Sequence, residues 1–200
     1  MSGKFIVIEG LDGAGTTTQA GLLRDWLAER GTVLLTREPT DRSVGRVIRK
    51  VLAGDPEAPD FHALPWLFAA DRADHLFGQI DPALKAGTHV ISDRYYHSSL
   101  AYQSLTLPLG KVAALNDFRA PDLTLFVDVS VDICLQRIEA RGDALEIFEK
   151  RDRLERIAGA YQEVNAFLRV RGELIEEIDG AKPVNEVFED IRASVEQLGV

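Results

Sequence analysis

Residues 5–19 read FIVIEGLDGAGTTTQ, and this stretch decides the fold of the 200-residue chain. Its first four residues are apolar, and their β-branched and aromatic side chains are typical of a buried strand. Gly10, Gly13 and Gly15 follow, and they allow the close backbone approach that an anion-binding turn needs. A helical pattern comes directly after them, so backbone N–H groups at the start of that helix would face the turn. The stretch therefore predicts a strand, a phosphate-binding turn and a helix.

The rest of the chain alternates in the same way between short apolar runs and longer helical patterns. The five runs are Phe5–Ile8, Thr32–Leu35, His89–Ile91, Leu123–Val127 and Leu174–Ile178. The helical patterns lie at 20–27, 63–80, 130–141, 151–168 and 183–197. Continuous apolar runs indicate strands buried on both faces, and helical connections supply the cover. We therefore predict an α/β fold with a five-stranded parallel sheet flanked by helices, as a single domain over residues 1–200.

Composition narrows the class of protein further. The chain has 23 Lys and Arg against 32 Asp and Glu, a formal net charge of −9, which disfavours a nucleic-acid binder. Cys134 is the only cysteine, which excludes an internal disulfide and a multi-thiolate zinc site and indicates a reducing compartment. No run approaches the ~20 apolar residues of a membrane span. We expect a cytoplasmic protein without nucleic-acid or membrane partners.

The glycine-rich turn almost matches the P-loop pattern G-x-x-x-x-G-K-[ST]. Gly10, Gly15 and Thr17 fit it, but Thr16 occupies the lysine position. The Thr17 hydroxyl would ligate the Mg²⁺ that bridges the nucleotide phosphates; alternatively the turn only reverses the chain and Thr17 is a first-turn hydroxyl. A charge-assisted contact is worth about 1.5–3 kcal/mol in a ground state. A transition-state donor is worth about a hundredfold in rate, so losing the lysine should weaken turnover more than binding.

Further motifs follow the turn in a fixed order along nearly the whole chain. They are Thr36-Arg37-Glu38-Pro39-Thr40, Gly45 with Ile48-Arg49, Phe68 with Arg72 and His75, Asp93-Arg94-Tyr95, Ser98-Ser99 with Ala101-Tyr102-Gln103, Pro121-Asp122-Leu123, Arg137 and Arg141-Gly142. In this order and spacing the chain resembles the thymidylate kinases, a family of P-loop nucleoside monophosphate kinases. The resemblance implies transfer of the γ-phosphoryl group of ATP to dTMP with Mg²⁺ as cofactor, a short lid at about 142–150, and a homodimer.

The resemblance also implies roles for individual residues. The ATP phosphates would contact Gly10, Asp12, Gly13, Ala14, Gly15, Thr16, Thr17 and Thr18. The acceptor dTMP would contact Asp12, Arg37, Glu38, Pro39, Phe68, Arg72, Arg94, Ser98, Ser99, Tyr102 and Gln103. Arg94 would grip the acceptor phosphate, while Asp93 and Thr17 would hold the metal ion. Phe68 would stack on the thymine ring and Arg72 would reach a base carbonyl.

Three departures from the family pattern bear on catalysis. Thr16 replaces the loop lysine, Gly13 stands where some members carry an arginine, and residues 142–149 contain no cation. We expect Arg137 and Arg141, one helical turn apart, to clamp the phosphates, with Arg141 as the preferred donor. Lys150, Arg151 and Arg153 follow as further cations. The alternative is that these arginines pair with neighbouring acids such as Glu139 or Glu146.

Two other functions stay open at this point. The first is a non-catalytic nucleotide-binding protein that kept the kinase fold, which Thr16 and the absence of cations from residues 142–149 favour. The second is a kinase for another acceptor such as dUMP or a nucleoside, because these residues do not separate thymine from uracil. Taken singly, Phe68 indicates core packing and Asp93-Arg94 an exposed strand-end ion pair.

Overall fold

The computed structural model describes residues 3–140 and 147–200 of the chain. Five strands form one sheet, in the order β2-β3-β1-β4-β5. Their bounds are β1 (Phe5–Gly10), β2 (Val33–Arg37), β3 (His89–Asp93), β4 (Leu123–Asp128) and β5 (Ile175–Asp179). Every neighbouring pair is parallel, and β1 lies in the middle, with Ile6 opposite Ile91 on one side and Leu123 on the other. The predicted five-stranded parallel sheet is confirmed.

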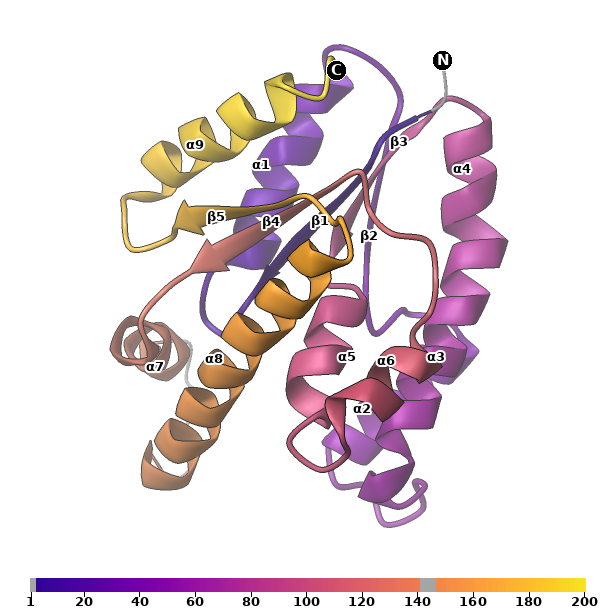
Figure 1. Ribbon diagram of the computed structural model, residues 1–200, viewed down its shortest axis with the longest axis vertical. Coiled ribbons are helices and arrows are strands. Elements are labelled where there is room, and N and C mark those ends of the chain that lie inside the picture. The colour runs from indigo at the N-terminus through magenta and orange to yellow at the C-terminus, as the bar shows by residue number, and fades with distance from the viewer. Residues whose placement is uncertain (1–2, 141–146) are drawn as a thin grey trace.

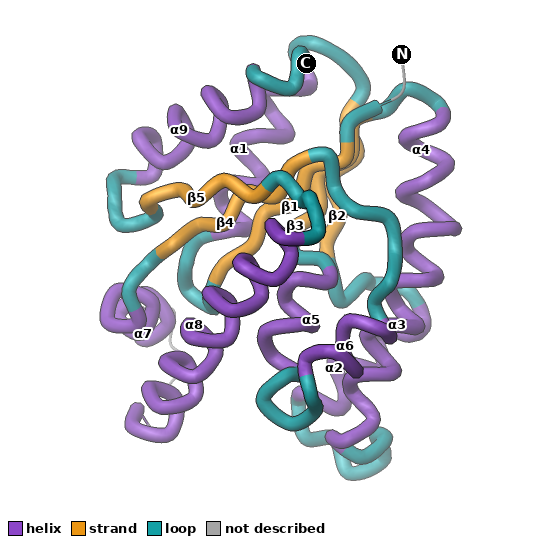
Figure 2. The backbone as a smooth tube through the Cα atoms, viewed as in Figure 1, coloured by secondary structure: helices purple, strands orange, loops and turns teal. Residues whose placement is uncertain are grey.

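Helices cover both faces of this sheet (Figure 1). They are α1 (Thr16–Ala28), α2 (Ser43–Leu52), α3 (Leu64–His75), α4 (Asp81–Lys85), α5 (Tyr96–Gln103), α6 (Leu109–Leu115), α7 (Val131–Ala140), α8 (Ile147–Val170) and α9 (Val184–Glu196). A 3₁₀ turn, η1 (Phe61–Ala63), precedes α3, and a π-helical turn, η2 (Leu76–Ile80), joins α3 to α4. Helices α1 and α9 pack together on one face, whereas α5 and α8 pack together on the other. Figure 2 shows the strands together in the middle of the molecule, with helices and loops around them.

The structure differs from the sequence predictions in two respects. The edge strands are not buried on both faces: in β5, Glu176 and Glu177 are exposed, because an edge strand has a neighbour on one side only. The sequence patterns also missed α2, α4, α5 and α6. Nearly all of α5 is buried, so it lacks the polar face that marks an amphipathic helix.

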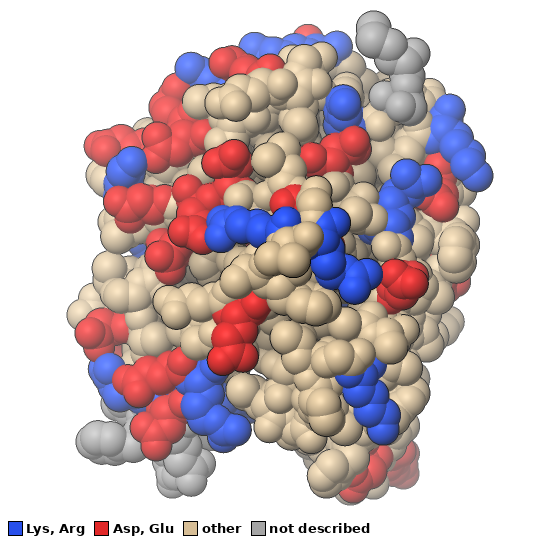
Figure 3. Space-filling model, in the orientation of Figure 1, with Lys and Arg blue, Asp and Glu red and all other residues tan. Residues whose placement is uncertain are grey.

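Two apolar clusters hold these layers together. The larger one contains every apolar residue of β1 and the inward faces of α1, α8 and α9. The smaller one is built from Ile48, Val51 and Leu64, and Phe68 packs against it, so that α2 and α3 form one wall beside the sheet. Within the described ranges, each helix is too short or too polar to cross a membrane. On the face drawn in Figure 3, basic and acidic side chains are interspersed.

Candidate functional site

The glycine-rich turn joins the central strand to α1 at the carboxyl edge of the sheet. Strand β1 ends at Gly10 and α1 begins at Thr16. Gly13 and Gly15 have φ angles of 89° and 97°, a left-handed conformation that favours glycine. No side chain caps the N-terminus of α1. The first amides of this helix are therefore available to an anion in the turn, as the sequence predicts.

Thr17 and Asp93 meet beside this turn. The Thr17 hydroxyl donates to Asp93 Oδ2 at 2.5 Å, although the two residues belong to α1 and β3. Asp93 is buried, and its Oδ1 has no hydrogen-bond partner among the described residues. A carboxylate oxygen without a partner, next to a hydroxyl, suits the oxygen-ligand preference of Mg²⁺. The pair that the sequence predicts as metal ligands is thus brought together and fits that ion.

Arg94 follows directly after β3 and turns its side chain toward the glycine-rich turn. Its φ angle of 74° is unusual for a residue other than glycine. The guanidinium donates to Ser98 Oγ at 3.0 Å, to Tyr161 Oη at 3.3 Å and to Asp12 Oδ1 at 2.8 Å. Burial opposes its charge, but Tyr102 and Tyr161, then Asp12 and Glu9, raise the pKa of Arg94 well above its ordinary value. Arg94 is therefore a fixed cation that reaches the turn.

A buried carboxylate that the sequence analysis did not single out supports Arg94 from below. Glu9, in β1, is fully buried. Its Oε1 accepts from the backbone amides of Tyr95 at 2.8 Å and Ser98 at 3.2 Å, and its Oε2 from the hydroxyls of Ser98 at 2.6 Å and Tyr161 at 3.0 Å. The same two hydroxyls accept from Arg94. The signal in the sequence is a lone charge inside an otherwise apolar strand, which must have partners when buried.

Arg72, on α3, is a second buried charged residue, and its partner Glu38 directly follows β2. The Arg72 guanidinium lies 2.6 Å from Glu38 Oε2 and donates to Ser99 Oγ at 3.0 Å and to Asn116 Oδ1. His75 Nδ1 lies 3.0 Å from the other Glu38 oxygen. Arg72 Nε has no hydrogen-bond partner among the described residues, although the side chain is 1% exposed. Arg72 is thus held in one orientation with part of its donor capacity unused.

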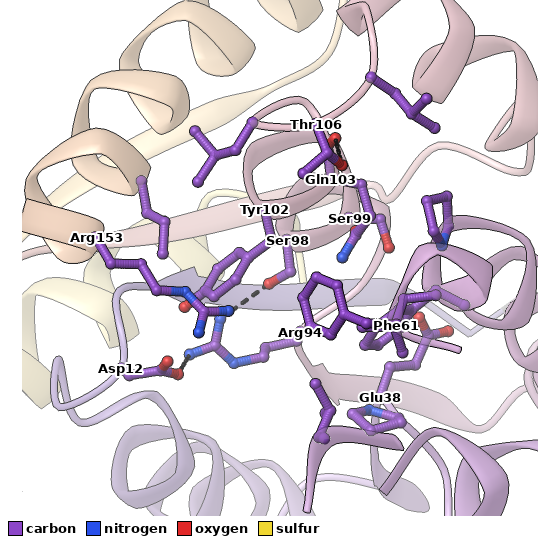
Figure 4. A pocket seen from close by; sticks show the side chains of 18 of the residues that line it. Asp12, Glu38, Phe61, Arg94, Ser98, Ser99, Tyr102, Gln103, Thr106 and Arg153 are labelled. Carbon is purple, nitrogen blue, oxygen red and sulfur yellow. Dashed lines mark hydrogen bonds and ion pairs between the residues drawn. The ribbon is translucent and has the colours of Figure 1, made fainter. Parts of the chain in front are cut away.

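These groups border one large cavity of about 1190 Å³ (Figure 4). All the residues expected to contact dTMP line it except Arg37, namely Asp12, Glu38, Pro39, Phe68, Arg72, Arg94, Ser98, Ser99, Tyr102 and Gln103. Gln103 Oε1 and the Tyr102 hydroxyl are buried without hydrogen-bond partners in the described structure, and burial raises the pKa of Tyr102. Phe61 and Trp66, which the sequence analysis did not single out, also line the cavity, as does Arg153, which it named only as a cation that follows the expected lid. The cavity thus offers aromatic walls and unpaired polar atoms.

Arg37 lies elsewhere. Its side chain is exposed, lies 3.1 Å from Asp41 Oδ1, and borders a separate hollow of about 640 Å³ together with Thr17 and Asp93. Adjacent residues of an extended segment point to opposite sides, so Glu38 enters the cavity and Arg37 faces away from it. The structure therefore does not bring Arg37 to the residues with which the sequence analysis grouped it.

Of the two arginines expected to clamp the phosphates, the structure describes Arg137 only. Arg137, on α7, donates to the main-chain carbonyls of Ala14 at 3.2 Å, Gly13 at 3.5 Å and Gly180 at 3.0 Å. It therefore braces the glycine-rich turn from outside, instead of pairing with Glu139. Arg141 and residues 142–146 of the expected lid lie outside the described residues.

Comparison with known proteins agrees with this arrangement. The sequence model of the thymidylate kinase family matches residues 8–191. The probable thymidylate kinase of Pyrococcus abyssi is 42% identical, over the whole of both chains, and that of Pyrococcus horikoshii is 45% identical over 78% of this chain and 79% of its own. The thymidylate kinase of Carboxydothermus hydrogenoformans is 37% identical over 99% of each chain. A match of this extent, to relatives of this similarity, shows that the chain belongs to the thymidylate kinase family.

Proposed function

We propose that this protein transfers the γ-phosphoryl group of ATP to the 5′-phosphate of dTMP, giving dTDP and ADP. The observation that carries the proposal is the position of Arg94. Its guanidinium lines the cavity and at the same time bonds Asp12 in the glycine-rich turn. A cation between a phosphate-binding turn and an acceptor-sized cavity is what phosphoryl transfer between two nucleotides requires.

In this proposal the cavity binds dTMP. Phe68 stacks on the thymine ring, and Arg72, held by Glu38, donates its unused N–H toward a base carbonyl. Gln103 and Ser99 serve the remaining polar edge of the base, and Tyr102 lies under the sugar, with Pro39 closing the wall. Unpaired polar atoms in a cavity favour a ligand that pairs with them, because leaving them buried and unsatisfied costs about 1–3 kcal/mol each.

The donor site is the turn between β1 and α1. Backbone amides from Gly13 to Thr18 cradle the phosphates of ATP, and Arg94 holds the acceptor phosphate against them. Thr17 and Asp93 hold Mg²⁺, which when bound neutralises charge on the phosphates. Asp12 keeps Arg94 in place and accepts from the sugar hydroxyl of dTMP.

Because Thr16 replaces the loop lysine, the proposed transfer needs another cation at the phosphates. We propose that cations on the lid side supply it, with Arg141 near the start of the lid at about 142–150. Arg137 contributes indirectly, since its bonds to Gly13 and Ala14 stiffen the cradle. We also propose a homodimer, which the exposed side chain of Phe77 supports, and a cytoplasmic location, which the free buried thiol of Cys134 supports.

The test is a coupled assay of ADP release with ATP and Mg²⁺ and with dTMP, dUMP or thymidine as acceptor. We expect turnover with dTMP to exceed that with the other acceptors. A parallel thermal-shift panel reports binding without turnover, because a ligand of the native state raises its apparent stability. Stabilisation by dTMP and ATP without ADP release would instead identify a non-catalytic nucleotide-binding protein.

A further inference from the structure

Arg153 is one of the cations that follow the expected lid, and the proposed function gives it no individual role. It lies on α8 and lines the cavity with Asp12 and Arg94. Figure 4 shows its guanidinium beside that of Arg94, on the side of the cavity where Asp12 lies. Arg153 makes no hydrogen bond or ion pair with any residue that the structure describes. Its charge is therefore available to a ligand.

The charges around Arg153 favour an anion. Asp12 is the carboxylate next to the two guanidinium groups in Figure 4, and Arg94 already occupies one of its oxygens. Asp12 and the buried Glu9 both offset the charge of Arg94, whereas Arg153 makes no ion pair with a described carboxylate, so a multiply charged anion can pair with it. Asp152 and Arg156, also from α8, line the cavity as well and offset each other in formal charge. A phosphoryl group placed between Arg94 and Arg153 would satisfy both.

The helix that carries Arg153 is anchored to the phosphate-binding turn. Tyr161, eight residues later on α8, donates to Glu9 Oε2 at 3.0 Å and lies 3.3 Å from the carbonyl oxygen of Gly10. Between them, Leu154 and Ile157 are buried in the main core. The rise of a helix puts Arg153 about 12 Å beyond Tyr161, over the cavity and not behind the sheet. Its backbone position is thus fixed relative to the turn.

We infer that Arg153 contacts the phosphoryl group being transferred and supplies the cation that Thr16 lacks. The inference rests on the proposed function. In the reaction an oxygen of the dTMP phosphate forms a bond to the γ-phosphorus, while the bond from that phosphorus to the β–γ bridging oxygen breaks and ADP leaves. Arg153 gives up no proton; its N–H groups donate hydrogen bonds to the equatorial oxygens, where charge is spread in the transition state.

The inference is tested with three single variants and one double variant. Arg153→Met should lower kcat about a hundredfold and leave the Kd of dTMP, measured by calorimetry, almost unchanged, because the contact forms with the transferring group. Arg153→Lys, which keeps a charge without the planar fork, should lie between Met and the wild type. The matched control is Arg151→Met, since Arg151 pairs with Asp132 at 2.6 Å and does not line the cavity. The double variant Thr16→Lys with Arg153→Met should regain about tenfold or more in kcat.

The outcomes separate the two proposals. A wild-type protein that releases no ADP with dTMP refutes the proposed function, whatever the variants do. An active wild type whose Arg153→Met variant keeps kcat within about threefold overturns the assignment of Arg153. So does a loss of dTMP affinity as large as the loss of kcat, which would make Arg153 an acceptor-binding residue. A double variant that regains nothing would show that Arg153 does not replace the lysine. Unfolding midpoints measured for every variant, including the one that changes the buried Thr16, test whether the fold is intact.

Discussion

Replacing Glu9 by glutamine is the sharpest test of how the site is held together. The substitution keeps the shape of the side chain and removes its negative charge. The carboxylate accepts four hydrogen bonds, two from backbone amides and two from the hydroxyls of Ser98 and Tyr161. In the variant the side-chain oxygen of glutamine can still accept from the two backbone amides. The side-chain nitrogen is a donor, so the hydroxyls of Ser98 and Tyr161 would have to accept from it instead of donating.

The expected loss follows from those four bonds. A hydrogen bond to a charged group contributes about 1.5–3 kcal/mol and a neutral one about 0.5–1.5 kcal/mol, so about 1 kcal/mol is lost at each contact that loses the charge. Since the bonds are coupled, the free energy of unfolding should fall by about 2–4 kcal/mol. The hydroxyls that accept from Arg94 are disturbed as well, so KM for dTMP should rise by about tenfold.

Urea denaturation and steady-state kinetics measure the two effects separately. Glu176→Gln is the control, because Glu176 is exposed on the edge strand β5 and should change the free energy of unfolding by less than about 0.5 kcal/mol. A Glu9→Gln variant within about 1 kcal/mol of the wild type would refute the reasoning on the buried network. A destabilised variant with an unchanged KM for dTMP would show that Glu9 does not orient Arg94.

Four further predictions concern single residues. Arg94→Ala should raise KM for dTMP far more than KM for ATP, and equal effects on both in kinetic assays would place the guanidinium outside the acceptor site. Arg72→Met should lower the free energy of unfolding in urea by about 3–5 kcal/mol, because it leaves the carboxylate of Glu38 buried without its arginine. Burial lowers the pKa of His89, so on acidification the unfolded chain binds a proton at this residue before the folded chain does. The free energy of unfolding should therefore fall as the pH is lowered from about 7.5 to about 5.5, and it should fall less steeply in His89→Asn. Burial raises the pKa of Cys134 to about 11, so a thiol reagent at neutral pH should label the native protein much more slowly than the urea-unfolded one; equal rates would contradict the buried thiol.

The sequence predicted the sheet well because a parallel strand carries its own signal. β-branched apolar runs marked all five strands to within two residues at each end. Short or wholly buried helices carry no such signal. Most side chains of helix α5 are buried, so it lacks the alternation of apolar and polar faces that marks a helix in the sequence. The seven residues of α6 are too few for a periodic pattern. The π-helical turn η2 continues α3 into α4, and no residue type in it marks such a turn.

The candidate site was predicted in part for a related reason. Sequence motifs indicate residues whose own side chains are expected to contact a ligand, such as Thr17, Asp93 and Arg94. They do not name partners that meet only through folding. Tyr161 bonds Glu9 across 152 residues of sequence, and nothing local to either residue indicates the other. The sequence analysis named Arg153 only as a cation that follows the expected lid, and the path of α8 is what brings it to the cavity.

Because β1 lies between β3 and β4 in the sheet, it cannot pair on both sides until both later strands have been synthesised. The backbone amide of Phe5 donates to Asp122, 117 residues later in the chain, and its strand pairs with Val90 and Leu123 on either side. In the nascent chain, β1 and the glycine-rich turn therefore wait for their neighbours until β3 and β4 have been synthesised. Non-local pairing of this kind slows folding and exposes an aggregation-prone segment. Chains stalled before β4 should depend on chaperones, whereas those released after β5 should not.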